Sequence, residues 1–422
     1  MPSNDGNRLF DRDTHIIIEG EEMNSGKTRL LAALKSAAVT LSAFAGTAAF
    51  AAETDQKTDT ASGSTASSGT AVSAEYERYL ESLSGYKYAG SDIVINAVDY
   101  AEAKGCDYEA VEGGATAGSV LSKKSYDVIA DELHSQRQKT DCLVWADNPY
   151  FKQQGSIDYV VDVPADGIYN IEFKYLPLNK TGATADTGDD KASNNPVELG
   201  VKIDGQTLYA GLDALSLPRM FVNNGASLDV PAGEVRVDTL GNELTPEQVE
   251  YGEFVTALAT DPVGVVAEPY KILLTAGRHV ITLESKYEPF ALASVTLKAP
   301  ADPMSYSDYS AKHADAKKYD GTAIEIEGED AWIKSTNSLV SKADNSSSDI
   351  TPNSPVKTIL NYIGSTNWQT PGQSITWVVD VAESGLYRLG MNYKQSAVID
   401  GFTYRSLTID GEMPFAECSS LR

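Results

Sequence analysis

The sequence predicts an all-β protein made of two related β-sandwiches, and three observations lead to this fold class. Apolar and polar residues alternate over short segments, which is the pattern of half-buried strands. The chain repeats itself once, at a distance too long for the unit of a solenoid. Tyrosine (22 residues) and glycine (33 residues) are abundant, which favours strands joined by tight turns.

The charge balance excludes several classes of partner. The 422 residues include 34 Lys and Arg against 60 Asp and Glu, so the formal net charge is −26. A chain this acidic lacks the basic surface that binds nucleic-acid phosphates, and we expect no nucleic-acid partner. Four His and three Cys leave little material for a metal centre or a catalytic triad. We therefore assign no catalytic residue and expect a protein that is not an enzyme.

A secretory signal peptide is predicted near the amino terminus. Basic residues between Lys27 and Lys35 precede an apolar run of small residues at 37–52, which ends in Ala49-Phe50-Ala51. A basic head, a short apolar body and an A-x-A pattern are the parts of a signal peptide. We predict cleavage between Ala51 and Ala52, and hence a secreted or cell-surface protein.

The true start is predicted at Met23. The run Glu19-Gly20-Glu21-Glu22 corresponds to purine-rich codons of the kind found in a bacterial ribosome-binding site. Residues 1–22 are then a mis-annotated upstream extension, residues 23–51 the signal peptide, and residues 52–74 a disordered Ser/Thr/Ala/Gly tether. The protein is therefore predicted to be bacterial.

An internal repeat organises the remaining chain. Ser156–Tyr175 matches Ser374–Tyr393 at nine of twenty positions, and Val201–Leu215 matches Leu407–Leu421 at five of fifteen. Self-similarity at this distance indicates two homologous domains. We predict a first sandwich with an N-terminal helix at 75–299, a helical linker at 300–320, and a second sandwich at 321–422.

The strands follow from alternation and from turn signals. In the first copy Ile157, Tyr159, Val161 and Val163 alternate with more polar residues, and Ile168–Tyr175 forms the next strand after a PADG turn. The Ile-Asp-Gly sequences at 203–205 and 409–411 predict tight hairpin turns, because Gly adopts positive φ readily. Two more strands are predicted at 279–285 and 291–298.

Helical pattern is confined to the joints of the chain. Short helices are predicted at 75–84 and 307–318, and Thr245-Pro246-Glu247 has the features of a helix start. It lies in a long segment, 221–270, that separates strands of the first copy. A connection of this length is usually functional or an intermodule contact, and both readings stay open.

The second copy is predicted to be incomplete. Leu421 corresponds to Leu215, and the first copy continues well beyond Leu215 to its last strands. The second copy then lacks those strands, including the one that pairs with its first strand. A sandwich with such exposed edges is unfavourable, so we expect further residues in a longer protein.

Several segments resemble a known class of module. The opening Ile324–Ala331 and the later Ser374–Tyr393 with Leu407–Glu412 are similar to jelly-roll, galactose-binding-like modules of carbohydrate-binding families 6 and 35. Segments 361–377, 406–415 and 241–249 resemble the amino-terminal tandem modules of bacterial extracellular solute-binding proteins of carbohydrate ABC transporters. This resemblance implies tandem jelly-roll sandwiches and, through a part not included here, a transporter permease as partner.

The resemblance also implies a cofactor. In the family, acidic residues of the first strand hold a structural calcium, and Glu327 and Glu329 stand at the matching positions of the second module. Carboxylate oxygens suit calcium. The alternative is a solvated acidic strand face, and we expect no other cofactor.

Aromatic residues in polar loops are the candidates for binding carbohydrate or polysaccharide. An aromatic ring stacks on the apolar face of a sugar while amides bond its hydroxyl groups. Trp368 beside Asn367, and Trp145, Asn148 and Tyr150 in the first copy, have this pattern. The alternative is that these rings close one end of the sandwich core.

Cys106 and Cys142 lie in the same copy, and both a disulfide and buried thiols are compatible with the sequence. Our leading hypothesis is an exported, non-catalytic carbohydrate-binding or spacer region of a solute-binding protein for sugar uptake. The alternatives are the accessory carbohydrate-binding region of a secreted glycoside hydrolase and a purely structural cell-surface protein.

Overall fold

The structure, a computed structural model, divides into two compact units that each contain one repeat. The first sandwich is Ala45–Arg219 with Glu250–Asp302, and the second is Met1–Phe44 with Met220–Val249 and Pro303–Arg422. The residues described are 15–19, 37–44, 66–108, 119–131, 136–146, 155–178, 195–227, 229–266, 268–300, 303–347, 350–395 and 402–422.

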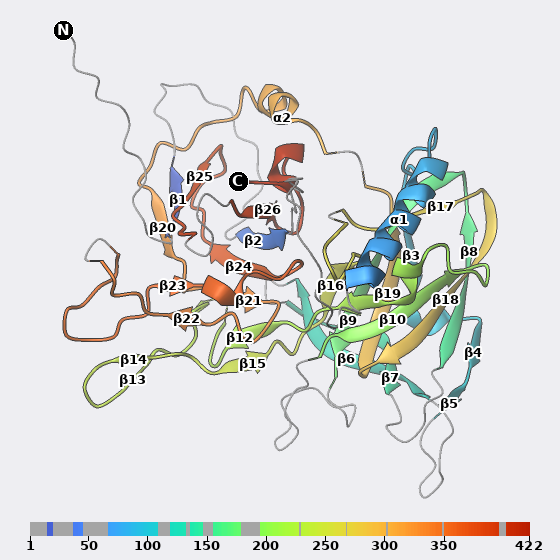
Figure 1. The fold of residues 1–422 in the computed structure, drawn as a ribbon, viewed down its shortest axis with the longest axis horizontal. Helices are drawn as coiled ribbons and strands as arrows, with labels where there is room; N and C mark the ends of the chain where they lie inside the picture. Colours follow the sequence, from blue (N-terminus) through green and yellow to red (C-terminus); the bar gives the residue numbers. More distant parts are fainter. Residues whose placement is uncertain are drawn as a thin grey trace, which may run out of the picture. The chain divides into compact units, whose positions relative to one another are not determined.

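The first sandwich has two mainly antiparallel sheets (Figure 1). One sheet has the order β11-β10-β18-β8-β4, formed by β4 (Glu102–Lys104), β8 (Ser156–Val163), β10 (Val197–Ile203), β11 (Leu215–Leu217) and β18 (Gly277–Tyr287). The other has the order β16-β9-β19-β7-β6-β5, and β17 and β3 also pair with β9 and β19 respectively. Its strands are β3 (Ile93–Asn96), β5 (Cys106–Tyr108), β6 (Ser119–Asp131), β7 (Gln136–Ala146), β9 (Gly167–Pro177), β16 (Val255–Leu258), β17 (Lys271–Leu274) and β19 (Phe290–Lys298). The all-β sandwich predicted for this copy is confirmed.

The alternation that predicted β8 is confirmed by burial. Ile157, Tyr159, Val161 and Val163 are all buried, because successive side chains of a strand point to opposite faces. The Tyr159 hydroxyl donates to the carbonyl of Ala97 at 2.9 Å. This bond satisfies a polar group that would otherwise be costly to bury.

Both predicted Asp-Gly turns are present. Asp204 and Gly205 have φ angles of 50° and 77°, and Asp410 and Gly411 have φ angles of 52° and 80°. Positive φ at both central residues is the conformation of a two-residue type I′ hairpin. The same sequence therefore makes the same turn in both copies.

Helix α1 (Ala66–Ser82) covers one edge of the first sandwich. The hydroxyls of Tyr76 and Tyr79 accept hydrogen bonds from the backbone amides of Lys271 and Leu273 in β17, at 2.9 and 2.8 Å. The helix begins at Ala66, within the segment predicted to be a disordered tether, and its two docked tyrosines hold its second half on the sandwich. Such a cover prevents an exposed strand edge from pairing with other chains.

The second sandwich also contains two principal sheets. One has the order β20-β1-β25 and the other β15-β12-β21-β24-β2-β26. The strands are β1 (His15–Glu19), β2 (Ala37–Phe44), β12 (Phe221–Asn223), β15 (Gln248–Glu250), β20 (Ile324–Glu327), β21 (Ile333–Lys334), β24 (Ser374–Val379), β25 (Arg388–Met391) and β26 (Tyr404–Ile409). Two small hairpins pair β13 (Arg236–Val237) with β14 (Glu243–Leu244) and β22 (Ser341–Lys342) with β23 (Tyr362–Ile363), and the linker helix α2 spans Tyr306–Lys312.

The core of the second sandwich is organised around Trp377. Its ring is 1% exposed and packs with Ile375, Val379 and Leu407. The indole Nε1 donates to the carbonyl of Gly328 at 3.0 Å. Trp377 is therefore a core residue, as its alternation with valine indicates.

The segment 220–249 belongs to the second sandwich although it follows a strand of the first copy. The helix predicted to start at Thr245 is wrong: the chain forms β14 and β15 on either side of Pro246. The backbone of Glu247 accepts a hydrogen bond from Asn224 rather than bonding within a helical turn. The segment's polar backbone groups are satisfied by strand-like partners, and this decides against a helix.

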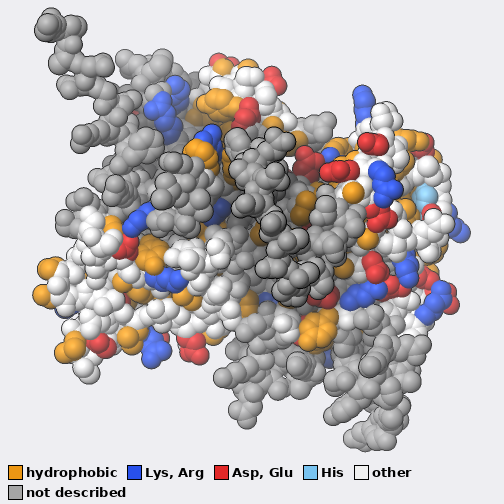
Figure 2. Space-filling model, viewed as in Figure 1, with side chains coloured by type: hydrophobic (Ala, Val, Ile, Leu, Met, Phe, Trp, Pro, Cys, Tyr) orange, Lys and Arg blue, Asp and Glu red, His pale blue; other side chains and the backbone are white. Residues whose placement is uncertain are grey.

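The β13–β14 hairpin exposes apolar side chains. Val237 is 58% exposed and Leu240 is 77% exposed, and Figure 2 shows hydrophobic side chains at this end of the second sandwich. On the first sandwich the same view shows acidic and basic side chains interspersed. Lys202 and Glu284 form one ion pair of this sandwich. The overall negative charge is thus not gathered into one acidic face in this view.

Cys106 and Cys142 carry thiols and form no disulfide, and burial raises the pKa of Cys142 to about 12. Among the described residues, no helix is both long and apolar enough to cross a lipid bilayer.

Candidate functional site

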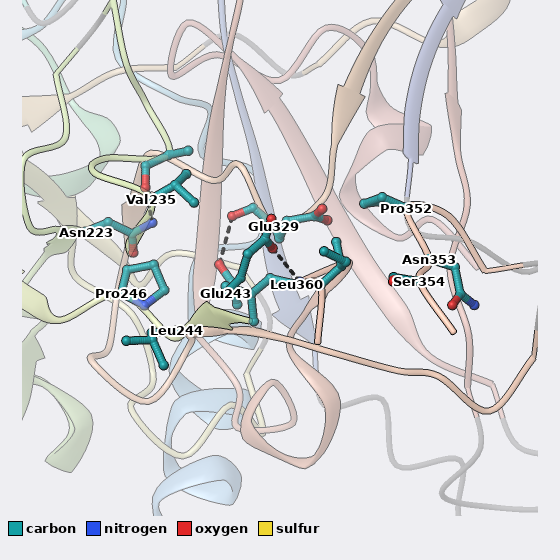
Figure 3. Close-up of a pocket in the computed structure, with 13 residues that line it drawn as sticks. Asn223, Val235, Glu243, Leu244, Pro246, Glu329, Pro352, Asn353, Ser354 and Leu360 are labelled. Atoms are coloured by element: carbon teal, nitrogen blue, oxygen red, sulfur yellow. Dashed lines mark hydrogen bonds between the residues drawn. The ribbon is translucent and has the colours of Figure 1, made fainter. Parts of the chain in front are cut away.

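A cavity of about 420 Å³ lies in the second sandwich, where segment 220–249 meets the loop around 352–360. Figure 3 shows side chains from both segments and from the end of β20 directed towards it. It is lined by Asn223, Ala232, Val235, Glu243, Leu244, Pro246, Glu329, Ser341, Pro352, Asn353, Ser354, Ile359 and Leu360. Its size falls within the range of about 300–1,000 Å³ that is typical of small-molecule sites.

Asn223 fixes segment 220–249 on the second sandwich. The side chain is 1% exposed, and its Oδ1 accepts hydrogen bonds from Lys334 Nζ and Gln248 Nε2, each at 2.7 Å. Its Nδ2 donates to the carbonyl of Ala232 at 2.6 Å. One amide therefore joins the two ends of the segment, its middle and β21, and it shapes one wall of the cavity.

The hairpin wall is held by backbone and carboxylate contacts. The amide of Glu243 donates to the carbonyl of Thr358 at 2.9 Å, and Glu243 Oε2 accepts from the amide of Leu360 at 2.7 Å. The amide of Thr358 donates to Asn242 Oδ1 at 2.9 Å. The hairpin and the facing loop are thus held together by three hydrogen bonds beside the cavity.

The opposite loop depends on Asn361, whose side chain is buried. Its Nδ2 donates to the carbonyls of Asp344 and Pro352 at 3.0 and 2.9 Å, and its Oδ1 accepts from the amide of Asp344 at 2.8 Å. These bonds fix Pro352, and with it the cavity wall that includes Asn353 and Ser354. Both walls are therefore pre-formed by buried amide side chains.

Glu329 is the most perturbed ionisable group at the cavity. The side chain is 7% exposed, and its Oε2 has no hydrogen-bond partner. Burial, reinforced by repulsion from Glu327, Asp330 and Glu243, raises the pKa of Glu329 to about 8. The carboxyl group is therefore mostly protonated at neutral pH, and can both donate and accept a hydrogen bond.

Lys334 lies behind Asn223 and is also perturbed. It is 1% exposed, and burial lowers its pKa to about 7. The pKa of Lys334 is lowered and the pKa of Glu329 is raised, because a buried environment disfavours the charged form of each group.

The calcium predicted at Glu327 and Glu329 needs more ligands than these two carboxylates. Calcium takes about six to eight oxygen ligands. Among the described residues, no group of three or more His, Cys, Asp or Glu is placed to hold a metal ion. The described residues therefore do not supply a calcium ligand set by themselves. The calcium assignment remains a prediction from the resemblance.

Trp368 and Asn367 lie at another place on the second sandwich, in a turn before β24. The Trp368 ring is half-buried against the second core, and the Arg405 guanidinium stacks over it with 4.4 Å between the guanidinium carbon and the ring centroid. Its Nε1 donates to Gln373 O at 3.4 Å, and Asn367 Nδ2 donates to Ser338 O at 2.7 Å. Arg405 therefore covers one face of the ring that was predicted to stack on sugar.

Trp145 is a buried residue of the first sandwich. It is 1% exposed and packs on Phe290, with 5.7 Å between ring centroids. This placement favours the packing alternative stated for the ring. Asn148 and Tyr150 lie outside the described residues, as do Ala51 and Ala52 at the predicted cleavage position.

Sequence reasoning singled out Glu329 but missed Asn223, Glu243 and Asn353. These three come from segments that the chain brings together only in the tertiary structure. Two signals were present in the sequence: the unusual length of the segment containing Asn223 and Glu243, and the family resemblance of 241–249. Neither signal indicates which sandwich the segment joins.

The chain was compared with family models, curated proteins and solved structures. No family model matches the chain, and no curated protein matches it. Among solved structures, it is similar to a family 35 carbohydrate-binding module from Clostridium thermocellum (11% identity, TM-score 0.21, 50% of this chain and 100% of that chain). It is also similar to a carbohydrate-binding module from Cellvibrio mixtus lichenase 5A, solved with cellotriose (11% identity, TM-score 0.22, 49% of this chain and 98% of that chain).

A third similar structure is the GH26-CBM35 β-(1,4)-mannanase of Podospora anserina (10% identity, TM-score 0.24). The match covers 51% of this chain and 30% of the mannanase, so the chain spans less than a third of that enzyme.

Proposed function

We propose that this chain is an exported, non-catalytic protein whose second sandwich binds a neutral carbohydrate in the cavity beside Glu329. The observation that supports this most directly is the lining of the cavity. It combines a pre-formed set of polar groups with an apolar wall, and a sugar ring presents both hydroxyl groups and apolar C–H faces.

The polar groups suit hydroxyl ligands. The protonated carboxyl of Glu329 has an oxygen without a partner, and Asn353 and Ser354 lie on the facing wall. A hydroxyl group donates and accepts hydrogen bonds, as a protonated carboxyl does. An unpartnered buried group of this kind is costly, and a bound hydroxyl would remove the cost.

The apolar wall and the local charge narrow the ligand class. Leu244, Pro246, Ile359 and Leu360 line the cavity, and the described residues place no aromatic side chain in its lining. Contact would therefore be through aliphatic groups rather than through a stacking ring. Glu243 near Glu329 would repel an anionic sugar, so we propose neutral monosaccharide or short oligosaccharide ligands.

The cavity proposal is tested by calorimetric titration of the full chain with a panel of neutral and acidic oligosaccharides. We expect one neutral sugar to bind, and Glu329→Ala and Asn353→Ala to weaken binding at least about tenfold by removing hydrogen-bonding partners. Trp368→Ala, in the rival loop, serves as the matched control and should leave affinity unchanged.

Two outcomes would contradict the cavity assignment. Loss of binding in Trp368→Ala with full binding in Glu329→Ala would transfer the site to the loop predicted from the sequence. Loss only in Tyr150→Ala would transfer it to the first sandwich. Binding of no sugar by the folded chain would instead favour the structural surface protein among the alternatives.

We place these modules in a receptor for sugar uptake, with a transporter permease as the eventual partner. This setting is supported by the resemblance of segments 361–377 and 241–249 to solute-binding proteins. If the genomic reading frame continues past codon 422, a two-lobed α/β receptor there supports the proposal. A catalytic barrel there would support the accessory region of a glycoside hydrolase instead.

A further inference from the structure

Two strands of the second sandwich come from the amino-terminal residues that the sequence assigns to the leader. Figure 1 shows β2 between β24 and β26, and β1 between β20 and β25, although the blue strands are far from their red and orange neighbours in sequence. All four pairings are antiparallel.

The first sandwich fills the corresponding places with its own last two strands. There β18 lies between β10 and β8, and β19 lies between β9 and β3. The internal repeat relates β8 to β24, β10 to β26, β9 to β25 and β3 to β20. β2 therefore occupies the place of β18, and β1 the place of β19.

The register of β2 agrees with that of β18 residue by residue. Ile281 of β18 lies opposite Tyr159 of β8. The repeat places Trp377 where the first copy has Tyr159, and Val39 of β2 lies opposite Trp377. The same agreement holds on the other side, where Ile203 and its repeat partner Ile409 face Ile281 and Val39 respectively.

The register of β1 agrees with that of β19. Val295 of β19 lies opposite Phe173 of β9, and Ile16 of β1 lies opposite Met391, the repeat partner of Phe173. A shift of one residue would turn every side chain of a strand to the other face. β1 and β2 are separate segments, and both pair in the register of the first copy. This agreement indicates that the neighbouring strands specify the register.

We propose that the places of β1 and β2 in the second sandwich together form a hairpin-binding site. The occupant for which this site is built is a β-hairpin from outside residues 1–422, and it has the strand pattern of β18–β19. β1 and β2 have 5 and 8 residues, and the corresponding strands β19 and β18 of the first sandwich have 9 and 11. Cleavage after Ala51, as predicted, would also remove both.

The chemistry of the occupant follows from the first sandwich. β18 buries alternate residues, Ile281 and Leu283 among them, and is joined to β19 by a tight turn at Glu288 (φ 64°). Without β2, the facing edges of β24 and β26 would offer rows of backbone donors and acceptors, and the buried Trp377 and Leu407 would need apolar cover. A hairpin of alternating apolar residues satisfies both requirements.

The test uses the full chain and a fluorescent synthetic peptide spanning Gly277–Lys298. Thr40 pairs with both Thr376 and Thr408, so Thr40→Pro removes a backbone donor in the middle of β2. We expect Thr40→Pro to bind the peptide at least about tenfold more tightly than the unchanged chain. Thr58→Pro, the same substitution outside these strands, is the matched control and should not change the affinity.

A second measurement does not depend on the folding of a proline variant. A full chain with a second copy of Gly277–Lys298 attached after Arg422 should show at least tenfold faster amide exchange in Ala37–Phe44 than the unchanged chain, with protection kept in β24 and β26. Protection of Ala37–Phe44 that persists in this chain would overturn the proposal. So would equal binding of a peptide carrying Ile281→Pro and Val295→Pro.

Discussion

Glu329 shows how one buried carboxyl group links the cavity to pH. Its pKa is raised from 4.5 to about 8, so folding keeps the proton while the unfolded chain releases it above pH 4.5. The unfolded state then binds fewer protons, and stability falls as pH rises from about 4.5 to about 8. Above about pH 8 Glu329 is ionised in the folded state, and the full free-energy cost of burying its carboxylate lowers the stability of the fold.

We predict that Glu329→Gln stabilises the second sandwich at pH 9 by a few kcal/mol, relative to the unchanged chain, with a much smaller difference at pH 4. The amide keeps the shape of the protonated carboxyl but cannot ionise. Urea unfolding at the two pH values measures the difference. Glu325→Gln, at an exposed position of the preceding strand β20, is the control. An equal effect of Glu329→Gln at both pH values would contradict the assignment.

Asn223 carries the attachment of segment 220–249 at the scale of one side chain. We predict that Asn223→Ala costs about 2–4 kcal/mol, because it leaves the buried donors of Lys334 and Gln248 without this acceptor. The pKa of Lys334 is lowered to about 7, so the ammonium is charged below that pH and the loss should be larger at pH 6 than at pH 9.

Chemical unfolding monitored by tryptophan fluorescence measures this loss. Asn353→Ala is the matched control, since that side chain is exposed and should change stability by less than about 0.5 kcal/mol. If Asn223→Ala lowers the stability equally at pH 6 and pH 9, the charge of Lys334 does not contribute to the hydrogen bond with Asn223.

At the scale of elements, the shape of segment 220–249 depends on a left-handed turn. Gly233 has a φ of 74°, and a Cβ there would lie 2.7 Å from the carbonyl oxygen of Asn224 and 2.8 Å from the Cβ of Asn223. We predict that Gly233→Ala costs at least about 1–2 kcal/mol, and weakens sugar binding because the cavity wall moves.

Gly252→Ala is the control for this prediction, since a Cβ at Gly252 meets nothing within 4 Å. Thermal unfolding and calorimetric titration measure the two effects. If Gly233→Ala and Gly252→Ala change the stability and the sugar affinity by the same amounts, the turn at Gly233 does not shape the cavity.

At the scale of the whole molecule, two compact units with separate cores should unfold in separate transitions. Arg219 of the first sandwich is 1% exposed in its side chain and pairs with Glu250 at 2.6 Å and with Glu288 at 3.3 Å. Removing one member of a buried ion cluster costs about 3–5 kcal/mol. We predict that Arg219→Ala lowers one calorimetric transition and that Asn223→Ala lowers the other.

Differential scanning calorimetry of the full chain tests this assignment. The Arg219→Ala, Asn223→Ala double variant should lower both transitions, because each substitution removes hydrogen bonds from a different unit. A single transition that both substitutions lower equally would mean that the two sandwiches unfold as one unit.

The candidate site was only partly predictable from the sequence. Glu329 was selected through its place after the first strand of the second copy. The protonation of Glu329 could not be predicted, because the burial of its side chain depends on segments distant in sequence. Trp145 and Trp368 were selected as rings in polar loops, yet one lies in a core and the other is covered by Arg405.

The sequence by itself determined the elements that depend on local pattern. Alternation gave β8 and β18, the repeat gave two related sandwiches, and Asp-Gly gave the same type I′ turn at 204–205 and 410–411. These features depend on neighbouring residues and on backbone sterics, which a short stretch of sequence contains.

Only the tertiary structure decided where segment 220–249 packs and which strands complete the second sandwich. Both outcomes depend on contacts between residues far apart in the chain, where many partners satisfy the same local pattern. Burial of apolar area and pairing of backbone groups select among those partners, and both are properties of the assembled sandwich. The cavity beside Glu329 and the hairpin-binding site are therefore visible only in the fold.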